Sequence, residues 1–308
     1  MRSTRVRLLL VAMLAVFAFS AVAATAAQAD PWWIVKCHNV GAGKGRYKNA
    51  TCTELGGTKE FDTRLLAGET RNTRSKQNSG TSGVFKLKTT IPLLTIECTS
   101  ETDKGQLIGG WPGTDTSEIT FDGCHVAGKT VAQCGASSTG KPAGEVGPFK
   151  VKTLLGFPKG RAPNKEEAYD QFFPEPSETE FISFELTGTA CGTLNKDKIK
   201  VLATGTKAKV TGTPLCGVIA RVGKIAAGAF KKTASGETAT EGGLEFPTPA
   251  ITEEEVWNPT TEKYEVVKCG LEVQTSSGPA TAEEVGVAIV EVSETLVPFT
   301  AEPFGWEE

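Results

Sequence analysis

The chain has 308 residues, of which 39% are hydrophobic and 22% are charged, and its formal net charge is −3 at pH 7. This mildly acidic composition argues against a nucleic-acid partner, because such a protein needs a basic face to neutralise phosphates. Two histidines in the whole chain leave little material for a zinc site or for the base of a Ser-His-Asp or Cys-His hydrolase.

Residues 1–29 carry the features of a Sec-type secretory signal peptide. Three arginines lie within the first seven residues, an apolar run extends from Leu8 to about Ala24, and Ala27-Gln28-Ala29 is a small-x-small cleavage signature. A membrane anchor is the alternative, but an Ala-rich, weakly hydrophobic run that ends in A-x-A is typical of a segment that is cut. We therefore predict cleavage after Ala29 and a secreted or cell-envelope-associated protein, with no stable membrane span after cleavage. Loss of the three arginines changes the net charge from −3 to about −6.

Eight cysteines follow the predicted cleavage site, and none of them lies in a C-x-x-C pair. Zinc sites built from cysteine need such close pairs, so an even number of separated cysteines in an exported chain predicts disulfides. The preferred short-range bridge is Cys37–Cys52, because it would close a loop of the length that contributes about 3 kcal/mol. The other pairings stay open among the 105 connectivities that eight cysteines allow. The cysteines are Cys37, Cys52, Cys98, Cys124, Cys134, Cys191, Cys216 and Cys269.

Residues 30–83 are rich in Gly, Thr, Asn and Arg and contain one cysteine pair. This composition predicts a small stapled arm or subdomain ahead of the main domain. Its glycine run VGAGKGRYKN, residues 40–49, resembles a phosphate loop. The run lacks the G-K-[ST] ending and the flanking strand and helix, so it is interpreted as a flexible loop.

From residue 84 onward, apolar residues alternate with polar ones between Gly, Pro, Thr and Ser punctuation, which is typical of half-buried strands. Cys98 and Cys269 fall on the apolar faces of two such strands, where a bridge between sheets would be buried. We predict an all-β domain over residues 84–308, either a β-sandwich or an irregular β-barrel, stapled by disulfides. The predicted inward sets are Phe85 and Leu87; Leu94, Ile96 and Cys98; Phe149, Val151, Leu155 and Phe157; Ile182, Phe184 and Leu186; and Val267, Cys269, Leu271 and Val273.

The stretch SEITFDGCHV, residues 117–126, brings Asp122, Cys124 and His125 close together in the sequence. If the stretch is one extended strand, Asp122 and His125 point to opposite faces and cannot share a proton or a metal. A bulge at Gly123 would change this. We interpret Cys124 as half of a disulfide and His125 as a residue at the end of a strand.

Four other stretches are assigned with less regular patterns. Residues 158–180 carry six acidic side chains and are interpreted as a polar, acidic loop insertion, with a binding lid as the alternative. Residues 253–265 contain an Asn-Pro turn signal and predict a hairpin connection. Residues 218–232 have helix-like spacing, but three glycines argue against a helix. Residues 281–284 look like a capping box, yet the following VGVAIVEV predicts a strand buried on both faces.

The sequence contains few motifs that indicate catalysis or metal binding. The sequence has no G-x-S-x-G or H-E-x-x-H pattern, and ETDKGQ, residues 101–106, does not fit the calcium-loop pattern. No catalytic residue, metal ligand or cofactor is predicted. Trp111 in GGWPGT and Trp257 in EVWNPT lie in turn contexts, where an exposed indole could stack on a sugar ring. The alternative is that each indole caps the end of the core.

The segment from about Cys98 to Cys216 resembles a family of uncharacterised exported proteins of soil actinobacteria. The likeness rests on IECTSETDKGQLIGG, on SEITFDGC, on the C-x9-C spacing from Cys124 to Cys134, on GEVGPFKVKTLLGF and on FELTGTACG. It implies export, a β-rich fold and structural cysteines, and it supplies no site residues. The acidic insertion and Cys216 depart from the family pattern, so the family's disulfide arrangement does not transfer to this chain.

Two functions from different classes are compatible with these patterns. The first is a secreted, non-enzymatic β-domain that is structural or binds a cell-surface or glycan partner. The second is an exported glycan-directed hydrolase that takes two carboxylates from residues 166–180 and 253–265. Acidic side chains that face each other in a deep pocket would favour the hydrolase.

Overall fold

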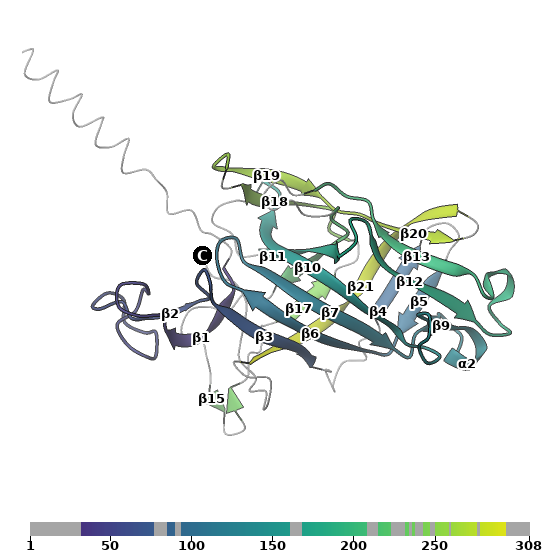
Figure 1. Cartoon of the computed structure of the whole chain (residues 1–308), viewed down its shortest axis with the longest axis horizontal. Helices are drawn as coiled ribbons and strands as arrows, with labels where there is room; N and C mark the ends of the chain where they lie inside the picture. The colour runs from purple at the N-terminus through teal and green to yellow at the C-terminus, as the bar shows by residue number, and fades with distance from the viewer. Residues whose placement is uncertain are drawn as a thin grey trace, which may run out of the picture.

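Figure 1 shows the computed structural model of the chain, which describes residues 32–76, 85–89, 94–160, 168–207, 215–222, 232–233, 236–237, 243–246, 250–258, 260–275 and 278–293. Nearly all the regular elements in these residues are β-strands, which confirms the predicted all-β fold. Within the same residues, no helix combines the length and the apolar character needed to span a bilayer. The predicted signal peptide, residues 1–29, lies outside the described part of the chain.

One set of antiparallel strands forms a ring that we call the first barrel. The ring closes where the long last strand, β21, pairs with β3. Alternate residues of each strand point to the interior, as the pleat requires. The strands in ring order are β3 (Thr70–Lys76), β6 (Ser100–Ile108), β7 (Thr114–Asp122), β10 (Val146–Pro158), β11 (Ala168–Glu175), β14 (Val218–Val222), β17 (Gly243–Phe246) and β21 (Gly278–Ser293).

A second ring, the second barrel, uses the other half of β21. Ala282–Val285 of β21 pair with β4, whereas Gly286–Ile289 pair with β17 of the first barrel. The two barrels therefore lie end to end along one continuous strand (Figure 1). The remaining strands of the second barrel in ring order are β4 (Phe85–Thr89), β5 (Thr95–Cys98), β8 (His125–Val126), β9 (Gly135–Ser137), β12 (Glu180–Thr187), β13 (Lys198–Ala203) and β20 (Leu271–Thr275).

Smaller elements close the ends and one side of this body. The β1–β2 pair extends from the end of the first barrel (Figure 1). The β18–β19 hairpin pairs through β18 with Phe157 and Pro158 at the end of β10. Leu154, Tyr169, Phe173 and Val256 pack together under this hairpin. The bounds are β1 (Ile34–Asn39), β2 (Phe61–Arg64), α2 (Val131–Cys134), η1 (Gly192–Leu194), β15 (Lys232–Thr233), β16 (Gly236–Glu237), β18 (Glu253–Asn258) and β19 (Lys263–Lys268).

All eight cysteines form disulfides, as predicted. The preferred pair Cys37–Cys52 is confirmed. Cys98 and Cys269 are both buried, as predicted. Cys269 lies between β19 and β20 and not within a strand, so the inward set predicted for residues 267–273 is divided between two strands. The two cysteines bridge to separate partners, and each bond joins segments that lie next to each other in the fold. The pairs are Cys37–Cys52, Cys98–Cys124, Cys134–Cys191 and Cys216–Cys269.

Removal of the first disulfide is expected to destabilise the segment that it closes. The double variant Cys37→Ser/Cys52→Ser should lose about 3 kcal/mol, because the bond closes a loop with a sequence separation of 15 residues. Denaturant unfolding of the variant and the wild type measures the difference. The variant Cys37→Ala/Cys52→Ala should lose the same amount, and a marked difference between the two variants would mean that side-chain contacts, not the loop constraint, carry the effect.

The interpretation of residues 158–180 as a polar loop is wrong for residues 168–175. Residues 168–175 form β11, a strand in the wall of the first barrel, and Ala168–Pro174 are all buried. Both faces of β11 are covered, one by the barrel interior and the other by the β18–β19 hairpin. Acidic and polar residues within the strand therefore do not mark solvent exposure.

The other strand assignments agree with the structure where it describes them. Phe85, Ile96, Phe149, Phe184 and Leu271 all face the cores that their alternation predicted. Residues 278–293 are a strand, so the capping box does not form a helix. Of the stretch with helix-like spacing, residues 218–222 are a strand, and residues 223–231 lie outside the described part of the chain. Residues 253–265 form the predicted hairpin. β3, from the segment predicted as an arm, pairs with β6 and β21 in the first barrel.

Candidate functional site

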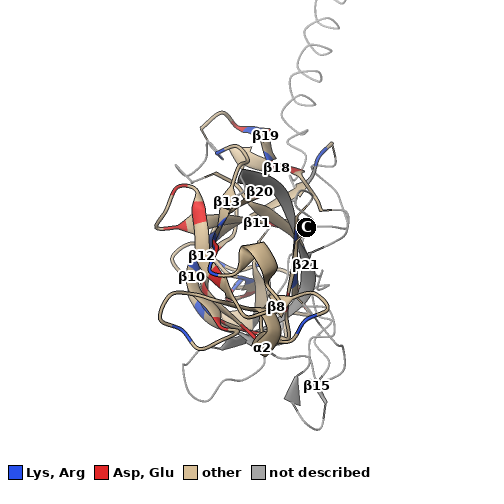
Figure 2. Ribbon diagram, turned by 90° about the vertical axis from the view of Figure 1, so that its right-hand side faces the viewer, with Lys and Arg blue, Asp and Glu red and all other residues tan. Residues whose placement is uncertain are grey.

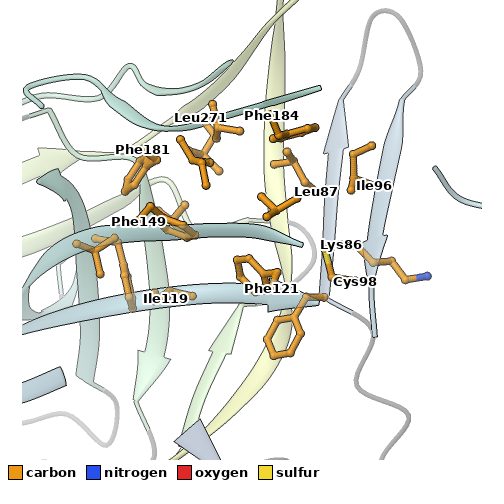
Figure 3. A pocket seen from close by; sticks show the side chains of 17 residues that line it. Lys86, Leu87, Ile96, Cys98, Ile119, Phe121, Phe149, Phe181, Phe184 and Leu271 are labelled. Carbon is orange, nitrogen blue, oxygen red and sulfur yellow. The ribbon is translucent and has the colours of Figure 1, made fainter. Parts of the chain in front are cut away.

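An apolar cavity of about 100 Å³ lies where the two barrels meet. Strands of both barrels line it, and their apolar side chains face one another across the space (Figure 3). The alternation of β7 and β10 places Ile119, Phe121, Phe149 and Val151 on the inward face, so the lining follows directly from the period-two pattern. Six phenylalanines contribute to the lining: Phe85, Phe121, Phe149, Phe172, Phe181 and Phe184.

The aromatic rings in this lining touch one another. The Phe121 ring lies 5.3 Å from that of Phe85 and 5.9 Å from that of Phe149, measured between centroids. Phe85, Phe121 and Phe181 are only half-buried, whereas Phe184 is almost fully buried. The lining thus combines half-buried aromatic rings with fully buried apolar side chains.

Charge is nearly absent from the cavity. Lys86 is the one charged residue among those that line it in the described part of the chain. Its Nζ lies 2.7 Å from Oε1 of Glu97 and points away from the space (Figure 3). Only the aliphatic stem of Lys86 therefore faces the interior. An occupant would meet apolar surface and no ionic partner from these residues.

A row of three buried carboxyl groups crosses the first barrel just beyond the cavity. We call Asp103 of β6, Asp115 of β7 and Asp170 of β11 the acid row. Their exposed fractions are 8%, 7% and 0%. Thr153 of β10 lies beside Asp115 and Asp170, and Ser117 lies beside Asp103. Gly105 makes room for the row's hydroxyl neighbours, because a Cβ there would lie 2.4 Å from Ser117 Oγ.

Burial keeps the acid row protonated well above the usual range of a carboxyl group. Desolvation raises the pKa of Asp103 to about 7, with a partial offset from the Ser117 hydroxyl. Desolvation also raises the pKa of Asp115 to about 7, to which the neighbouring Asp103 adds. The pKa of Asp170 rises well above its usual value for the same reason, increased by Asp115. At neutral pH the row is thus at least partly uncharged.

A fourth buried carboxyl group, Glu254 of β18, lies outside the barrel wall. It is fully buried beside Gln171, which points to the outer face of β11. Desolvation, reinforced by Asp170, raises the pKa of Glu254 well above its usual value. Gly156 leaves space for this carboxyl, because a Cβ there would lie 2.5 Å from Glu254 Oε1.

These carboxyl groups do not form the arrangement that glycoside hydrolysis needs. Asp170 and Glu254 come from the two segments predicted to supply a catalytic pair, and their charges interact. They lie on opposite faces of β11, however, and both have 0% exposure. A sugar and its attacking water must reach both carboxyls of such a pair. This geometry gives access to neither.

The candidate sugar-stacking residues Trp111 and Trp257 stack on each other. Their ring centroids are 4.9 Å apart, and Tyr264 packs against Trp257 at 5.2 Å. Trp257 lies in β18 rather than in a turn and is 7% exposed. The two indoles thus belong to the packing between the β18–β19 hairpin and the barrel. This agrees with the alternative interpretation, in which each indole caps the end of the core.

The stretch with Asp122, Cys124 and His125 is not one strand. β7 ends at Asp122, Gly123 has a φ of 65°, and His125 begins β8 in the second barrel. Cys124 is bonded to Cys98, and His125 Nδ1 lies 2.8 Å from the carbonyl oxygen of Gly123. The break occurs at the glycine where a bulge was considered, and Cys124 takes the disulfide role predicted for it.

The second histidine, His38, contacts an acidic side chain. It lies in β1, and its Nε2 is 3.0 Å from Oε2 of Glu69, with 11% of the side chain exposed.

Among the described residues, no group of three or more His, Cys, Asp or Glu side chains is arranged to hold a metal ion. Figure 2 shows both Lys or Arg residues and Asp or Glu residues on the loops and strands around α2.

Comparison with protein-family models, with curated proteins and with solved structures finds no match for this chain. The resemblance to exported actinobacterial proteins therefore stays a prediction. The function must therefore be inferred from the residues of the candidate site. The two features that bear on it are the apolar cavity and the acid row. Sequence reasoning missed the acid row, although all three aspartates alternate in phase with inward-facing residues of their strands.

Proposed function

We propose that this chain is an exported, non-enzymatic binding protein that holds a small, uncharged apolar molecule in the cavity between its two barrels. The observation that carries this proposal is the lining of the cavity, which combines six phenylalanine rings with aliphatic side chains, and whose described residues present no charged group to the interior. Apolar cavities of a similar size stay dry and accept molecules such as benzene or xenon.

The chemistry of the cavity selects against polar occupants. A hydroxyl or charged group placed there would lose its hydrogen bonds to water and gain none from this lining, which costs several kcal/mol. An apolar molecule gains about 25 cal/mol for each Å² of surface that it buries.

Export to an oxidising compartment is supported by two independent features. The amino-terminal segment has the charge, apolar run and cleavage signature of a signal peptide. The four disulfides fit the same destination, because such bonds persist outside the reducing cytosol. A freely secreted protein and one retained at the envelope both fit this proposal.

Benzene binding tests the proposed function. Calorimetric titration of the purified protein is expected to show saturable binding of benzene with a Kd on the order of 1 mM or below. Leu87→Trp should abolish binding, because Leu87 lines the cavity and an indole there would fill it. Val266→Trp serves as the matched control, since Val266 is 43% exposed on β19 and does not line the cavity. Equal binding by all three proteins would refute the assignment of the site.

A further inference from the structure

The loop between β1 and β2, residues 40–60, projects from the end of the first barrel (Figure 1). We call it the stapled loop. Leu55 lies in this loop and is 73% exposed. Among the described residues, Val266 of β19 is the other exposed large hydrophobic residue, at 43%. A single exposed leucine is common on protein surfaces, so the surroundings of Leu55 must decide whether it has a role.

A disulfide and backbone hydrogen bonds hold the stapled loop in one shape. Cys52, three residues before Leu55, is bonded to Cys37 of β1. Lys48 and Glu54 pair across the two arms of the loop, through the backbone at 2.9 Å and through Nζ and Oε2 at 2.6 Å. Because folding has already ordered this loop, a partner that contacts Leu55 does not have to order it again.

The stapled loop is basic, although the chain as a whole is acidic. It contains four basic and two acidic residues and therefore has a net charge of +2, whereas the predicted mature chain has about −6. Lys44, Lys48 and Lys59 are exposed. The N–H of Gly45 donates to the carbonyl oxygen of Lys59 at 2.7 Å, so Lys44 and Lys59 lie on neighbouring segments. The loop is thus a basic surface that also carries an exposed leucine.

An anionic phospholipid surface has both chemical properties that match this loop. Its phosphate groups attract lysine ammonium groups, and the acyl chains beneath them accept an apolar side chain. A soluble polyanion would satisfy the lysines but leave Leu55 in water. The other exposed uncharged side chains near Leu55 are small, and they fit the polar headgroup layer: Ala50, Thr51, Thr53 and Thr58.

We infer that the stapled loop docks on an anionic phospholipid surface, with its lysines at the phosphate groups and Leu55 among the acyl chains. This inference is independent of the cavity and goes beyond the proposed function, because it favours retention of the exported protein at a membrane. One leucine and a few lysines give reversible docking and not permanent insertion. The cavity lies where the two barrels meet, so docking through the stapled loop leaves it outside the lipid.

Co-sedimentation of residues 30–308 with lipid vesicles tests the inference. The wild type should bind vesicles of equal parts phosphatidylglycerol and phosphatidylcholine about tenfold more strongly than vesicles of phosphatidylcholine alone. Binding should weaken when sodium chloride is raised from about 0.1 M to about 0.5 M, because salt screens exposed charges. Leu55→Ser should weaken binding to the anionic vesicles about tenfold, and so should Lys44→Gln/Lys59→Gln.

Two variants away from the stapled loop are the matched controls. Val266→Ser removes the other exposed large hydrophobic residue. Lys129→Gln/Lys198→Gln removes two exposed lysines, one beside α2 and one in β13 of the second barrel. Both control proteins should bind the anionic vesicles as tightly as the wild type. Near-ultraviolet circular dichroism should be the same for all five proteins, because every substituted side chain is exposed.

Three results would overturn the inference. The first is equal sedimentation with both kinds of vesicle, or none with either. The second is binding that the lysine variant loses but Leu55→Ser keeps in full, since the loop would then recognise polyanions without entering a lipid layer. The third is an equal loss of binding in the control variants, because another surface would then contact the vesicles. None of these results affects the cavity, which benzene titration tests separately.

Discussion

Replacement of Trp33 by alanine is expected to lower the free energy of unfolding by about 3–5 kcal/mol. Trp33 is 1% exposed and packs with Leu65, Leu107, Leu155 and Phe157 at the end of the first barrel opposite the cavity. Its Nε1–H donates to the carbonyl oxygen of Thr114 at 2.9 Å. The variant would leave both a large void and an acceptor without its donor. Denaturant unfolding followed by circular dichroism measures the loss.

Two comparisons identify the source of this loss. Trp33→Phe keeps most of the ring volume but removes the indole donor, so it should cost less than Trp33→Ala by at least 1 kcal/mol. Val266→Ala, at an exposed position on β19, should change stability by less than about 0.5 kcal/mol. A loss below 1 kcal/mol for Trp33→Ala would show that this end of the barrel does not depend on the indole.

Asp115→Asn should stabilise the protein in alkaline solution and have little effect in acid. The folded-state pKa of Asp115, about 7, lies above the ordinary value of 3.8 that applies after unfolding. Between these values the folded state holds a proton that the unfolded state has lost. The stability of the wild type therefore falls as the pH rises from about 4 to about 7 and stays low above that range. Asparagine removes this dependence.

The expected gain at pH 8.5 is on the order of 2–4 kcal/mol, because each unit of pKa difference corresponds to about 1.4 kcal/mol. Urea unfolding at pH 4 and at pH 8.5 gives the two values needed for each protein. Asp122→Asn is the control on the same strand. If Asp115→Asn is neutral or destabilising at pH 8.5, the acid row must be compensated in a way that these contacts do not provide.

The strands could be predicted where one face met solvent. In β10, Lys150 and Lys152 alternate with Phe149, Val151 and Thr153, and this contrast carries the period of the pleat. β12 gave an equally clear pattern. Disulfide formation could also be predicted, because eight separated cysteines after a predicted signal peptide have few other uses.

β11 could not be predicted by the same reasoning. Its sequence AYDQFFPE has no contrast between faces, because the barrel interior and the β18–β19 hairpin cover both sides. Asp170 and Gln171 look like solvent-exposed residues until the covering elements are known. The acid row could not be predicted for the same reason, because the sequence does not distinguish a buried aspartate from an exposed one.

The cavity depends on strand pairings that local patterns do not encode. β4 and β3 come early in the chain, and both find their partner in β21, near its other end. The alternation of apolar and polar residues predicts which side chains point inward. It does not predict that Phe149 of the first barrel and Phe184 of the second barrel line the same cavity. Closure of the two rings determines that.

The position of β21 also affects when the molecule can fold. Synthesis proceeds from the amino terminus, so almost all strands of both barrels are made before β21, the strand that completes both rings. Until then β3 and β4 keep unsatisfied backbone groups along one edge, and neither interior is sealed from water. Neither barrel can therefore close before β21 has been synthesised.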